Sequence, residues 1–188
     1  MNTLLIRCLD FLFAALGLLL ALPLLLLVLL IGLFDTGSPV FAQQRVGRHQ
    51  RPFTLYKFRT MSVGTASVAT HEVGSSSITP MGAVLRKTKI DELPQLINVL
   101  KGEMSLVGPR PCLPSQQQLI LERERGGVFL VRPGITGLAQ VNEIDMSTPE
   151  LLAQWDARMI AEFSLTLYFK LLVQTVLGAG AGDRVKPD

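Results

Sequence analysis

The stretch RKTKIDELPQLINVLKGEMSLVGPRP, residues 86–111, decides how this 188-residue chain is organised. It sets two adjacent carboxylates, Asp91 and Glu92, at an expected helix start, with basic side chains on both sides. Apolar residues follow at helical spacing, Pro94 falls within the tolerant first turn, and Gly102 stands just past the expected end. The sequence therefore predicts a short amphipathic helix with Asp91 as its N-cap.

The carboxylate pair has a chemical and a purely structural interpretation. The helix dipole and the nearby cations Arg86, Lys87 and Lys89 favour an ionised Asp91. An ionised aspartate can attack phosphorus and form an acyl phosphate. Glu92 could share a Mg²⁺ ion with it or relay a proton, because Mg²⁺ takes one or two carboxylates plus substrate phosphates. A plain helix cap with an acidic first turn is the commoner outcome, so the pair alone favours structure.

Two proline-bounded arginines shift the balance toward a phosphate site. Arg110 stands in GPRP (residues 108–111), where two prolines fix the backbone and present one guanidinium, a good phosphate ligand. Arg132 begins RPGITG (residues 132–137), whose glycines allow the backbone to approach a ligand closely. Each segment alone is compatible with a tight turn that carries a surface cation. Together with the basic helix and the carboxylate pair, they predict a diphosphate site.

An apolar run, Phe11 to Phe34, precedes this region and carries no charged residue. A straight helix of that length would span a bilayer core of about 30 Å. Pro23 stands near its centre, where it removes a helix hydrogen bond and clashes with the preceding turn. Each half would then cross only about half of the bilayer.

Three interpretations of this run compete. A signal peptide is disfavoured, because the apolar core is too long and no Ala-x-Ala-type cleavage site follows it cleanly. A kinked spanning helix is the default, since membrane helices tolerate proline. A re-entrant hairpin gains support from positive charge on both sides, at Arg7 and at Arg45, Arg48 and Arg51, which leaves no clear outer end. Physical reasoning alone slightly favours the spanning helix.

The composition indicates one domain with an apolar part: 48% of the residues are hydrophobic, 18% are charged, and the net charge is +3. From Thr36 to His71 the chain has no acidic residue but several arginines, which favours anionic partners such as lipid headgroups or nucleotides. The aromatic and glycine signatures of RNA-binding modules are missing, which argues against nucleic acid. Cys8 and Cys112 show no metal-ligand spacing and are expected to be unpaired thiols.

The remaining elements follow from local signals. Two strands are expected around a basic hairpin tip, followed by a mobile loop, a helix capped by Thr79, and a helix that starts at Thr148. The helix after Thr148 carries an apolar stripe that favours core packing over the membrane interface, whereas the apolar segment after it suits the membrane surface. The expected ranges are Val40 to Val46, Phe53 to Met61, residues 62–77, Pro80 to Lys87 and Phe163 to Leu177.

In three ordered motifs the chain closely resembles the bacterial monotopic phosphoglycosyl transferases. The first is KFRTM (residues 57–61), the second is the stretch from Leu85 to Pro111, and the third is RPGITGLAQVN (residues 132–142). The resemblance covers nearly the whole chain.

The resemblance implies a reaction and its ligands. The enzyme would transfer a phospho-sugar from a UDP-sugar to undecaprenyl phosphate in a ping-pong scheme. Asp91 would be the nucleophile that releases UMP, Glu92 its partner, and Mg²⁺ the cofactor held by both. Substrate and phosphate ligands would come from the three motifs: Arg86, Lys57, Arg59, Arg110, Arg132 and Thr136.

The resemblance also implies an architecture and a location. The fold would be α+β and mainly helical, with residues 1–36 as a re-entrant helix-break-helix anchor. Residues 37–188 would form a membrane-surface catalytic domain with interfacial helices and a short β-hairpin. The protein would be monotopic in the inner membrane with its catalytic domain on the cytoplasmic face. In the family a Ser-Pro pair breaks the helix; here it is Leu22-Pro23, so the sequence leaves the geometry of the break open.

Partners and rival functions follow from the same reasoning. The expected partners are a UDP-sugar, undecaprenyl phosphate and membrane lipid, and no nucleic acid. Downstream glycosyltransferases are possible further partners. The rivals are a membrane-attached phosphohydrolase that uses water as acceptor and a non-catalytic membrane scaffold. The segment Glu143 to Thr148 is the expected specificity determinant, for which the working hypothesis is an N-acetylated sugar, with a 6-deoxy sugar as an option.

Overall fold

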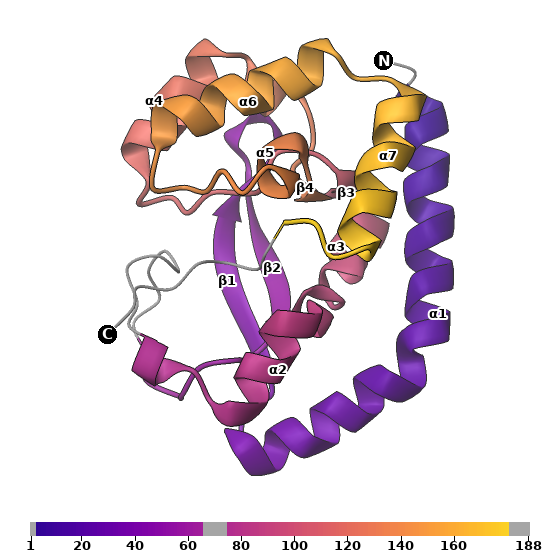
Figure 1. The fold of residues 1–188 in the computed structure, drawn as a ribbon, viewed down its shortest axis with the longest axis vertical. Coiled ribbons are helices and arrows are strands. Elements are labelled where there is room, and N and C mark those ends of the chain that lie inside the picture. Colours follow the sequence, from indigo (N-terminus) through magenta and orange to yellow (C-terminus); the bar gives the residue numbers. More distant parts are fainter. Residues whose placement is uncertain (1–2, 66–74, 181–188) are drawn as a thin grey trace.

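The computed structural model describes residues 3–65 and 75–180. Over this part of the chain the fold is α+β and mainly helical, as predicted, with two small two-stranded sheets (Figure 1). Most of the expected loop at residues 62–77 lies outside the described residues. The helices are α1 Thr3–Asp35, α2 Pro80–Thr88, α3 Gln95–Lys101, α4 Gln117–Arg125, α5 Leu138–Val141, α6 Pro149–Ala161 and α7 Leu165–Val176. The strands are β1 Val40–Val46, β2 Pro52–Phe58, β3 Ser105–Val107 and β4 Gly134–Thr136.

The predicted hairpin is confirmed, with a shorter second strand. Strands β1 and β2 pair antiparallel from Val40 with Phe58 to Val46 with Pro52. The strand ends at Phe58 rather than Met61 because the next residues pair elsewhere. The Thr79 amide donates to the Thr60 carbonyl at 3.1 Å, and Met61 forms a bridge with Ile78. Thr60 and Met61 therefore contact the residues just before α2 instead of extending the hairpin.

Helix α1 is bent rather than interrupted. It runs continuously from Thr3 to Asp35 with Pro23 inside it, and Figure 1 shows its two halves at a wide angle. A proline within a helix is the usual cause of such a kink. The expected break into two helices is therefore not seen, and whether both ends return to one face of a membrane stays a prediction.

Helix α1 is long and apolar enough to cross a membrane, and only 17% of its most apolar window is buried. That exposure distinguishes it from the core helix of a soluble protein. Its N-terminal half nevertheless contributes Ile6 and Ala14 to the largest core cluster, together with Val99 of α3 and Leu171 of α7. The division into an anchor of residues 1–36 and a catalytic domain of residues 37–188 stays a prediction.

The prediction that Asp91 caps a helix is wrong. Helix α2 starts as predicted, with the Thr79 hydroxyl accepting from the Gly82 amide at 2.9 Å, and it ends at Lys89, whose φ of 58° is left-handed. A single 3-10 turn, Ile90–Glu92, follows, and α3 begins only at Gln95. The left-handed residue redirects the chain, so Asp91 lies inside a tight turn between two helices instead of at a helix start. Gly102 ends α3 with a φ of 83°, as expected.

Strands β3 and β4 form a parallel pair that the sequence did not indicate. Their contact depends on two glycines. A Cβ atom on Gly134 would lie 2.0 Å from the Gly108 backbone nitrogen, and one on Gly108 would lie 2.5 Å from the Arg132 carbonyl oxygen. The glycines therefore serve backbone packing between the two proline-bounded arginine segments.

Helices α6 and α7 differ in the surface they present. In α6 Leu152 and Met159 are buried, which confirms core packing for that stripe. In α7 Tyr168 and Leu171 are buried while an apolar face stays exposed, and Figure 1 shows α7 alongside the first half of α1. The exposed face of α7 consists of Leu165, Phe169, Val173 and Val176.

Candidate active site

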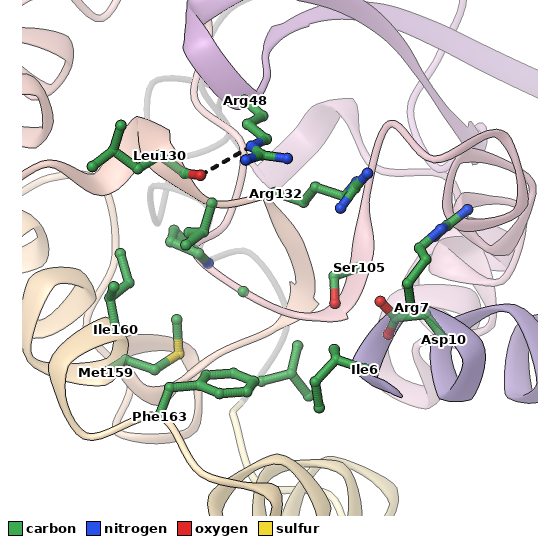
Figure 2. A pocket seen from close by; sticks show the side chains of 14 residues that line it. Ile6, Arg7, Asp10, Arg48, Ser105, Leu130, Arg132, Met159, Ile160 and Phe163 are labelled. Atoms are coloured by element: carbon green, nitrogen blue, oxygen red, sulfur yellow. Dashed lines mark hydrogen bonds between the residues drawn. The ribbon is translucent and has the colours of Figure 1, made fainter. Parts of the chain in front are cut away.

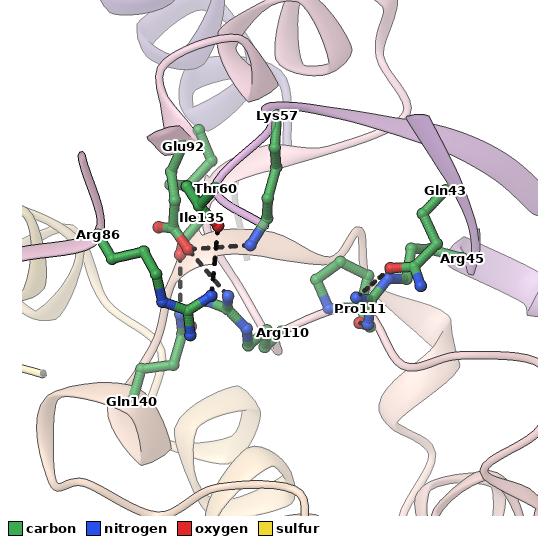
Figure 3. A network of polar contacts seen from close by, with 10 residues as sticks. All are labelled: Gln43, Arg45, Lys57, Thr60, Arg86, Glu92, Arg110, Pro111, Ile135 and Gln140. Carbon is green, nitrogen blue, oxygen red and sulfur yellow. Dashed lines mark hydrogen bonds and ion pairs between the residues drawn. The ribbon is translucent and has the colours of Figure 1, made fainter. Parts of the chain in front are cut away.

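Glu92 lies where two cations from distant segments meet (Figure 3). Its Oε1 accepts hydrogen bonds from Lys57 Nζ at 3.3 Å and from Arg110 Nη2 at 2.8 Å. Lys57 comes from β2, and Arg110 from the segment after β3. All three side chains are at most 19% exposed, so these ion pairs are shielded from bulk water and stronger than surface pairs. The structure thus brings three predicted site residues together.

Asp91 is buried in the same 3-10 turn, with 7% of its surface exposed. The turn is fixed by backbone hydrogen bonds from Glu92 to the Lys89 carbonyl and from Leu93 to the Ile90 carbonyl. The Lys89 amine donates to the Ala179 carbonyl at 2.6 Å, and its partial burial lowers its pKa below the ordinary value of 10.5. The adjacent carboxylates therefore have a fixed backbone and a cationic neighbourhood.

Arg86 reaches the same network from α2. Its Nη1 lies 3.5 Å from the Thr60 hydroxyl, which belongs to the predicted KFRTM motif (Figure 3). Helix α2 rests directly on that residue, because a Cβ atom on Gly82 would lie 2.0 Å from the Thr60 carbonyl oxygen. This close packing fixes the distance between α2 and the segment that carries Thr60. It therefore also fixes the position of Arg86, which lies one helical turn after Gly82.

Two buried arginines hold the backbone that carries Arg110. Arg123 donates from Nη1 to the Arg110 carbonyl at 2.8 Å, and Arg45 donates from Nη1 to the Pro111 carbonyl at 3.0 Å. Arg123 also forms an ion pair with Asp156 at 2.7 Å. No motif in the sequence points to Arg123 and Asp156, since they belong to separate helices. A charged residue within an otherwise apolar helix face is the signal that could have indicated the pair.

Asn98 ties the hairpin to α3 and was also missed. Fully buried, it accepts from the Tyr56 amide at 3.2 Å and donates to the Thr54 carbonyl and to Glu103 Oε2, both at 2.7 Å. Tyr56 directly precedes Lys57, so this side chain fixes the strand from which Lys57 reaches Glu92.

The other predicted ligands lie elsewhere in the structure. Arg59 donates to the Ser38 carbonyl at 2.8 Å and covers the Phe41 ring, at the junction of α1 and β1. Arg132 donates to the Gly102 carbonyl at 2.8 Å and lines a separate pocket. The buried Thr136 shares a hydrogen bond with Thr175 at 2.6 Å. In this conformation all three side chains form contacts within the protein. Their predicted roles as substrate or phosphate ligands stay predictions.

The carboxylate pair could supply only part of the ligands of a metal ion. Within residues 3–65 and 75–180 no group of three or more His, Cys, Asp or Glu side chains could hold an ion alone. Asp91 and Glu92 offer two carboxylates, which is the protein share of a Mg²⁺ site that takes its other ligands from water and substrate phosphates. The donor set therefore fits Mg²⁺ and does not fit a structural zinc or calcium site.

Comparison with known proteins shows the family of the chain. Residues 1–180 match the family described as Bacterial sugar transferase. The chain is 45% identical over 141 residues to the uncharacterized sugar transferase EpsL of Bacillus subtilis, covering 74% of this chain and 69% of that protein. It is 41% identical over 180 residues to the UDP-glucose:undecaprenyl-phosphate glucose-1-phosphate transferase of Caulobacter vibrioides, covering 90% and 67%.

A third relative is longer than this chain. The UDP-N-acetylgalactosamine-undecaprenyl-phosphate N-acetylgalactosaminephosphotransferase of Aeromonas hydrophila is 38% identical over 181 residues, which cover 90% of this chain but 42% of that protein. The chain thus spans about two thirds of some curated relatives and less than half of others. Both the length of the family match and the identity to these proteins exceed what chance agreement gives. The chain belongs to the bacterial sugar transferase family.

Proposed function

We propose that this chain transfers a sugar 1-phosphate from a UDP-sugar to undecaprenyl phosphate, giving undecaprenyl-diphosphate-sugar and UMP. The observation that carries the proposal is the buried Asp91 beside a Glu92 that is held by Lys57 and Arg110. The names of relatives such as the Caulobacter vibrioides enzyme, which pair a UDP-sugar with undecaprenyl phosphate, support the same substrates.

In the first half-reaction a carboxylate oxygen of Asp91 attacks the phosphorus that bears the sugar. A new bond forms between this oxygen and phosphorus, and the bond from phosphorus to the oxygen bridging to the uridine monophosphate unit breaks. UMP leaves with the electron pair of that bond. The product is an acyl phosphate on Asp91 that carries the sugar.

In the second half-reaction an oxygen of undecaprenyl phosphate attacks the same phosphorus. The acyl-phosphate bond breaks, and Asp91 recovers its carboxylate. Two displacements at one phosphorus give ping-pong kinetics. Arg86, Lys57 and Arg110 stabilise the phosphate oxygens, since charge on these oxygens develops in a site shielded from water.

Glu92 has two tasks in this proposal. It keeps Lys57 and Arg110 at fixed positions before the substrate arrives, and it provides the second carboxylate beside Asp91. Mg²⁺ held by the pair would neutralise part of the diphosphate charge. Arg59, Arg132 and Thr136 remain proposed substrate ligands that would have to exchange their present contacts for substrate.

The proposed location is the cytoplasmic face of the inner membrane. Residues 1–36 would anchor the protein as a re-entrant segment bent near Pro23, and residues 37–188 would form the catalytic domain. The exposed apolar surface of α1 and the exposed face of α7 support contact with lipid, and the Phe13 and Phe169 rings, 6.2 Å apart, link the two helices. The product would start a glycan that downstream glycosyltransferases extend.

The sugar is proposed from a single segment. Residues 143–148 form a tight turn after α5, in which Glu143 has a φ of 59° and the Asp145 carboxylate accepts from the Ser147 amide at 2.9 Å. We keep an N-acetylated sugar, with a 6-deoxy form as an option, as the first candidate. Relatives named for glucose and for N-acetylgalactosamine define the panel that must be compared.

The decisive experiment measures UMP release by the full chain in detergent, with undecaprenyl phosphate, Mg²⁺ and a panel of UDP-sugars. Wild-type protein should release UMP with at least one sugar, and a phospho-sugar adduct on Asp91 should be detectable by mass spectrometry when the lipid is omitted. Asp91→Asn should abolish both. If no UDP-sugar supports release, or if Asp91→Asn equals wild type, the proposal fails.

The same assay separates the two rivals. A phosphohydrolase would release UMP at full turnover without lipid, because water would accept the phospho-sugar. A scaffold would release none, and Asp91→Asn would change nothing measurable. The Glu162→Gln variant, at an exposed surface ion pair with Arg158, is the matched carboxylate control for Glu92→Gln.

A further inference from the structure

Asp10 is a buried carboxylate that the proposed reaction does not use. It lies in the first half of α1, where Ile6 and Ala14 on the same side are buried and Leu12 and Leu16 are exposed. Only 2% of Asp10 is exposed. A buried carboxylate is costly unless its oxygens accept hydrogen bonds, and an apolar residue at this position would pack without that cost. An ionisable residue on such an apolar helix therefore indicates a function.

The Asp10 carboxylate is the partner of β3 at its open edge. Among the described residues β3 pairs only with β4, and the Ser105 amide donates to the Pro133 carbonyl on that side at 2.8 Å. Successive residues of a strand direct their amides to opposite edges, so the Leu106 amide points away from β4. It donates to Oδ1 of Asp10 at 3.0 Å, and Figure 2 shows this carboxylate close to the segment that carries Ser105. Asp10 thus satisfies a buried backbone group that an apolar side chain would leave unpaired.

Arg7 holds the same part of the chain from the preceding turn of α1. Its Nη2 donates to the Leu100 carbonyl at 3.1 Å, and its Nη1 donates to the Met104 carbonyl at 3.4 Å. Arg7 and Asp10 are three residues apart and therefore lie on neighbouring turns of one side of the helix. Together they hold the backbone of residues 100–106, which connects α3 to β3, at three points.

The segment held by α1 lies between two parts of the candidate active site. Glu92 belongs to the turn before α3, and Arg110 follows β3. Their side chains meet at 2.8 Å, although the chain between them passes through α3, residues 100–106 and β3. On the edge toward β4, the Gly108 amide donates to the Thr136 carbonyl at 2.8 Å. The backbone that leads to Arg110 is therefore held by β4 on one edge and by Asp10 on the other.

Helix α1 also packs against both helices that flank the catalytic turn. In its first half, a Cβ atom on Gly17 would lie 3.2 Å from Cδ1 of Leu96 in α3. In its second half, Val28 forms a buried cluster with Leu85 of α2, and Ile90 of the 3-10 turn packs against that cluster. The helix thus contacts the elements on either side of the carboxylate pair, which supports a role for α1 beyond that of an anchor.

We propose that Asp10 is a positioning residue of the active site: through the Leu106 amide it fixes β3 and thereby the place of Arg110 beside Glu92. This inference rests on the proposed transfer reaction, in which Arg110 stabilises phosphate oxygens. It makes the first half of α1 part of the catalytic unit. A misplacement of about 1 Å can slow an enzymatic reaction about 100-fold, so loss of the Asp10 bond slows the chemical step.

The test counts competent molecules and measures their rate separately. The full chain in detergent is mixed with Mg²⁺ and a saturating UDP-sugar from the panel, without lipid, and mass spectrometry follows the phospho-sugar adduct on Asp91. The final amount of adduct gives the competent fraction, and the rate constant of its formation gives the speed per competent molecule. A loss of folded protein lowers the first quantity, whereas a misplaced Arg110 lowers the second.

Asp10→Ala removes the acceptor and should lower the rate constant at least about tenfold. Asp10→Val, which also lacks an acceptor, carries the same expectation if Asp10→Ala does not fold. Asp10→Asn keeps an oxygen that accepts from both donors, so its rate constant should stay within about threefold of wild type. A rate constant for both Asp10→Ala and Asp10→Val that equals wild type overturns the proposal.

Tyr168→Phe is the matched control. It removes the other hydrogen bond of Asp10 Oδ1, which is 2.9 Å long, and leaves the bond to the Leu106 amide in place. It should lower the melting temperature but keep the rate constant within about threefold of wild type. In an Arg110→Gln background, Asp10→Ala should cost less than about threefold, because the residue that it positions is gone. Equal rate constants for Asp10→Ala and Tyr168→Phe, or a tenfold loss in both backgrounds, contradict the positioning role.

Hydrogen exchange gives a readout that does not need the reaction. The amides of residues 106–108 should exchange at least about tenfold faster in Asp10→Ala than in wild type or Tyr168→Phe, because β3 opens more easily. Unchanged exchange in Asp10→Ala overturns the proposal whatever the activity. If no UDP-sugar gives an adduct in wild type while exchange rises as expected, the proposed function fails and the hold of Asp10 on the segment before Arg110 stands.

Discussion

Arg123 donates two hydrogen bonds to Oδ2 of Asp156, from Nε at 3.0 Å and from Nη2 at 2.7 Å, inside the core between α4 and α6. Both side chains are 2% exposed. The third bond of Arg123 goes to the Arg110 carbonyl. A buried ion pair thus positions the backbone of Arg110, the cation that contacts Glu92.

The first prediction concerns this pair. Asp156→Leu leaves the Arg123 charge buried without its partner, so the free energy of unfolding should fall by about 3–5 kcal/mol. The double variant Arg123→Met/Asp156→Leu should recover most of that loss, since hydrophobic residues often replace a buried pair at little cost. Thermal unfolding in detergent, followed by circular dichroism, measures both.

Arg158→Met, at the exposed pair with Glu162, is the control for that series and should cost less than about 1 kcal/mol. If Asp156→Leu lowered the free energy of unfolding no more than Arg158→Met does, the buried pair would not contribute to stability as expected.

The second prediction concerns Arg110 and Glu92. Arg110→Lys keeps the charge but loses the planar fork, so UMP release should fall about tenfold. Arg110→Gln also loses the charge and should fall further, by about 100-fold. With Glu92→Gln the rate of UMP release should fall by at least about 100-fold, because a carboxylate beside the proposed nucleophile is lost. Initial rates at saturating UDP-sugar measure all three. Equal rates for Arg110→Lys and Arg110→Gln would argue against a role of the charge.

The third prediction concerns the close approach of β3 and β4. Gly134→Ala puts a methyl group 2.0 Å from a backbone nitrogen, and backbone cannot move aside as a side chain can. The variant should lose at least about 3 kcal/mol of stability or fail to fold. Gly126→Ala is the matched control: its new Cβ would meet its nearest neighbour at 3.4 Å, with an ordinary φ of −80°. Similar melting temperatures for the two variants would show that the backbone contact is looser than described.

The fourth prediction concerns the two thiols. Cys112 is buried, and burial raises the pKa of its thiol above the ordinary value of 9.0, whereas Cys8 is exposed. Because the thiolate is the reactive form, N-ethylmaleimide at pH 8 should modify Cys8 in the folded protein and Cys112 at least about tenfold more slowly. Mass spectrometry of peptides measures both rates. Equal modification of the two thiols in the folded state would contradict the burial of Cys112.

The same shift has a consequence for stability against pH. Above about pH 9.0 the unfolded thiol ionises while the folded one stays protonated, so the folded state binds more protons. The free energy of unfolding should therefore fall as pH rises from 9.0 to the folded-state pKa. Cys112→Ala should remove this contribution and show a flatter stability profile over that range. An identical slope in the variant would assign the loss to other groups.

The features that the sequence predicted correctly depend on local signals. The strand Val40–Val46 beside its turn, the Thr79-Pro80 helix start and the glycine at position 102 each depend on signals within a few residues, and each was confirmed. The position of Asp91 was misjudged for a related reason. An Asp before an apolar run is typical of a helix N-cap. Here, however, the left-handed Lys89 is followed by a 3-10 turn, Ile90–Glu92, which precedes the helix. A positive φ at lysine leaves no trace in the sequence pattern.

The parts of the site that the sequence alone could not place depend on long-range pairing. Arg110 and Arg132 look alike in the sequence, each beside a proline, yet Arg110 contacts Glu92 and Arg132 lines a separate pocket. The pairing of β3 with β4 separates them, and three-residue strands are too short to be recognised from alternation. The ion pair of Arg123 with Asp156 joins two helices without any motif, so only the folded chain reveals it.

The bond between Asp10 and Tyr168 joins residues 158 positions apart. During synthesis at about 5–20 residues per second, the tyrosine emerges roughly 10–30 s after the aspartate. Helix α1 thus leaves the ribosome before α7 exists to donate the Tyr168 hydroxyl to the Asp10 carboxylate. The contact between α1 and α7 at Asp10 can therefore form only after α7 has been synthesised. A ribosome stalled before α7 would leave α1 without Tyr168, and a membrane protease would meet it in that state.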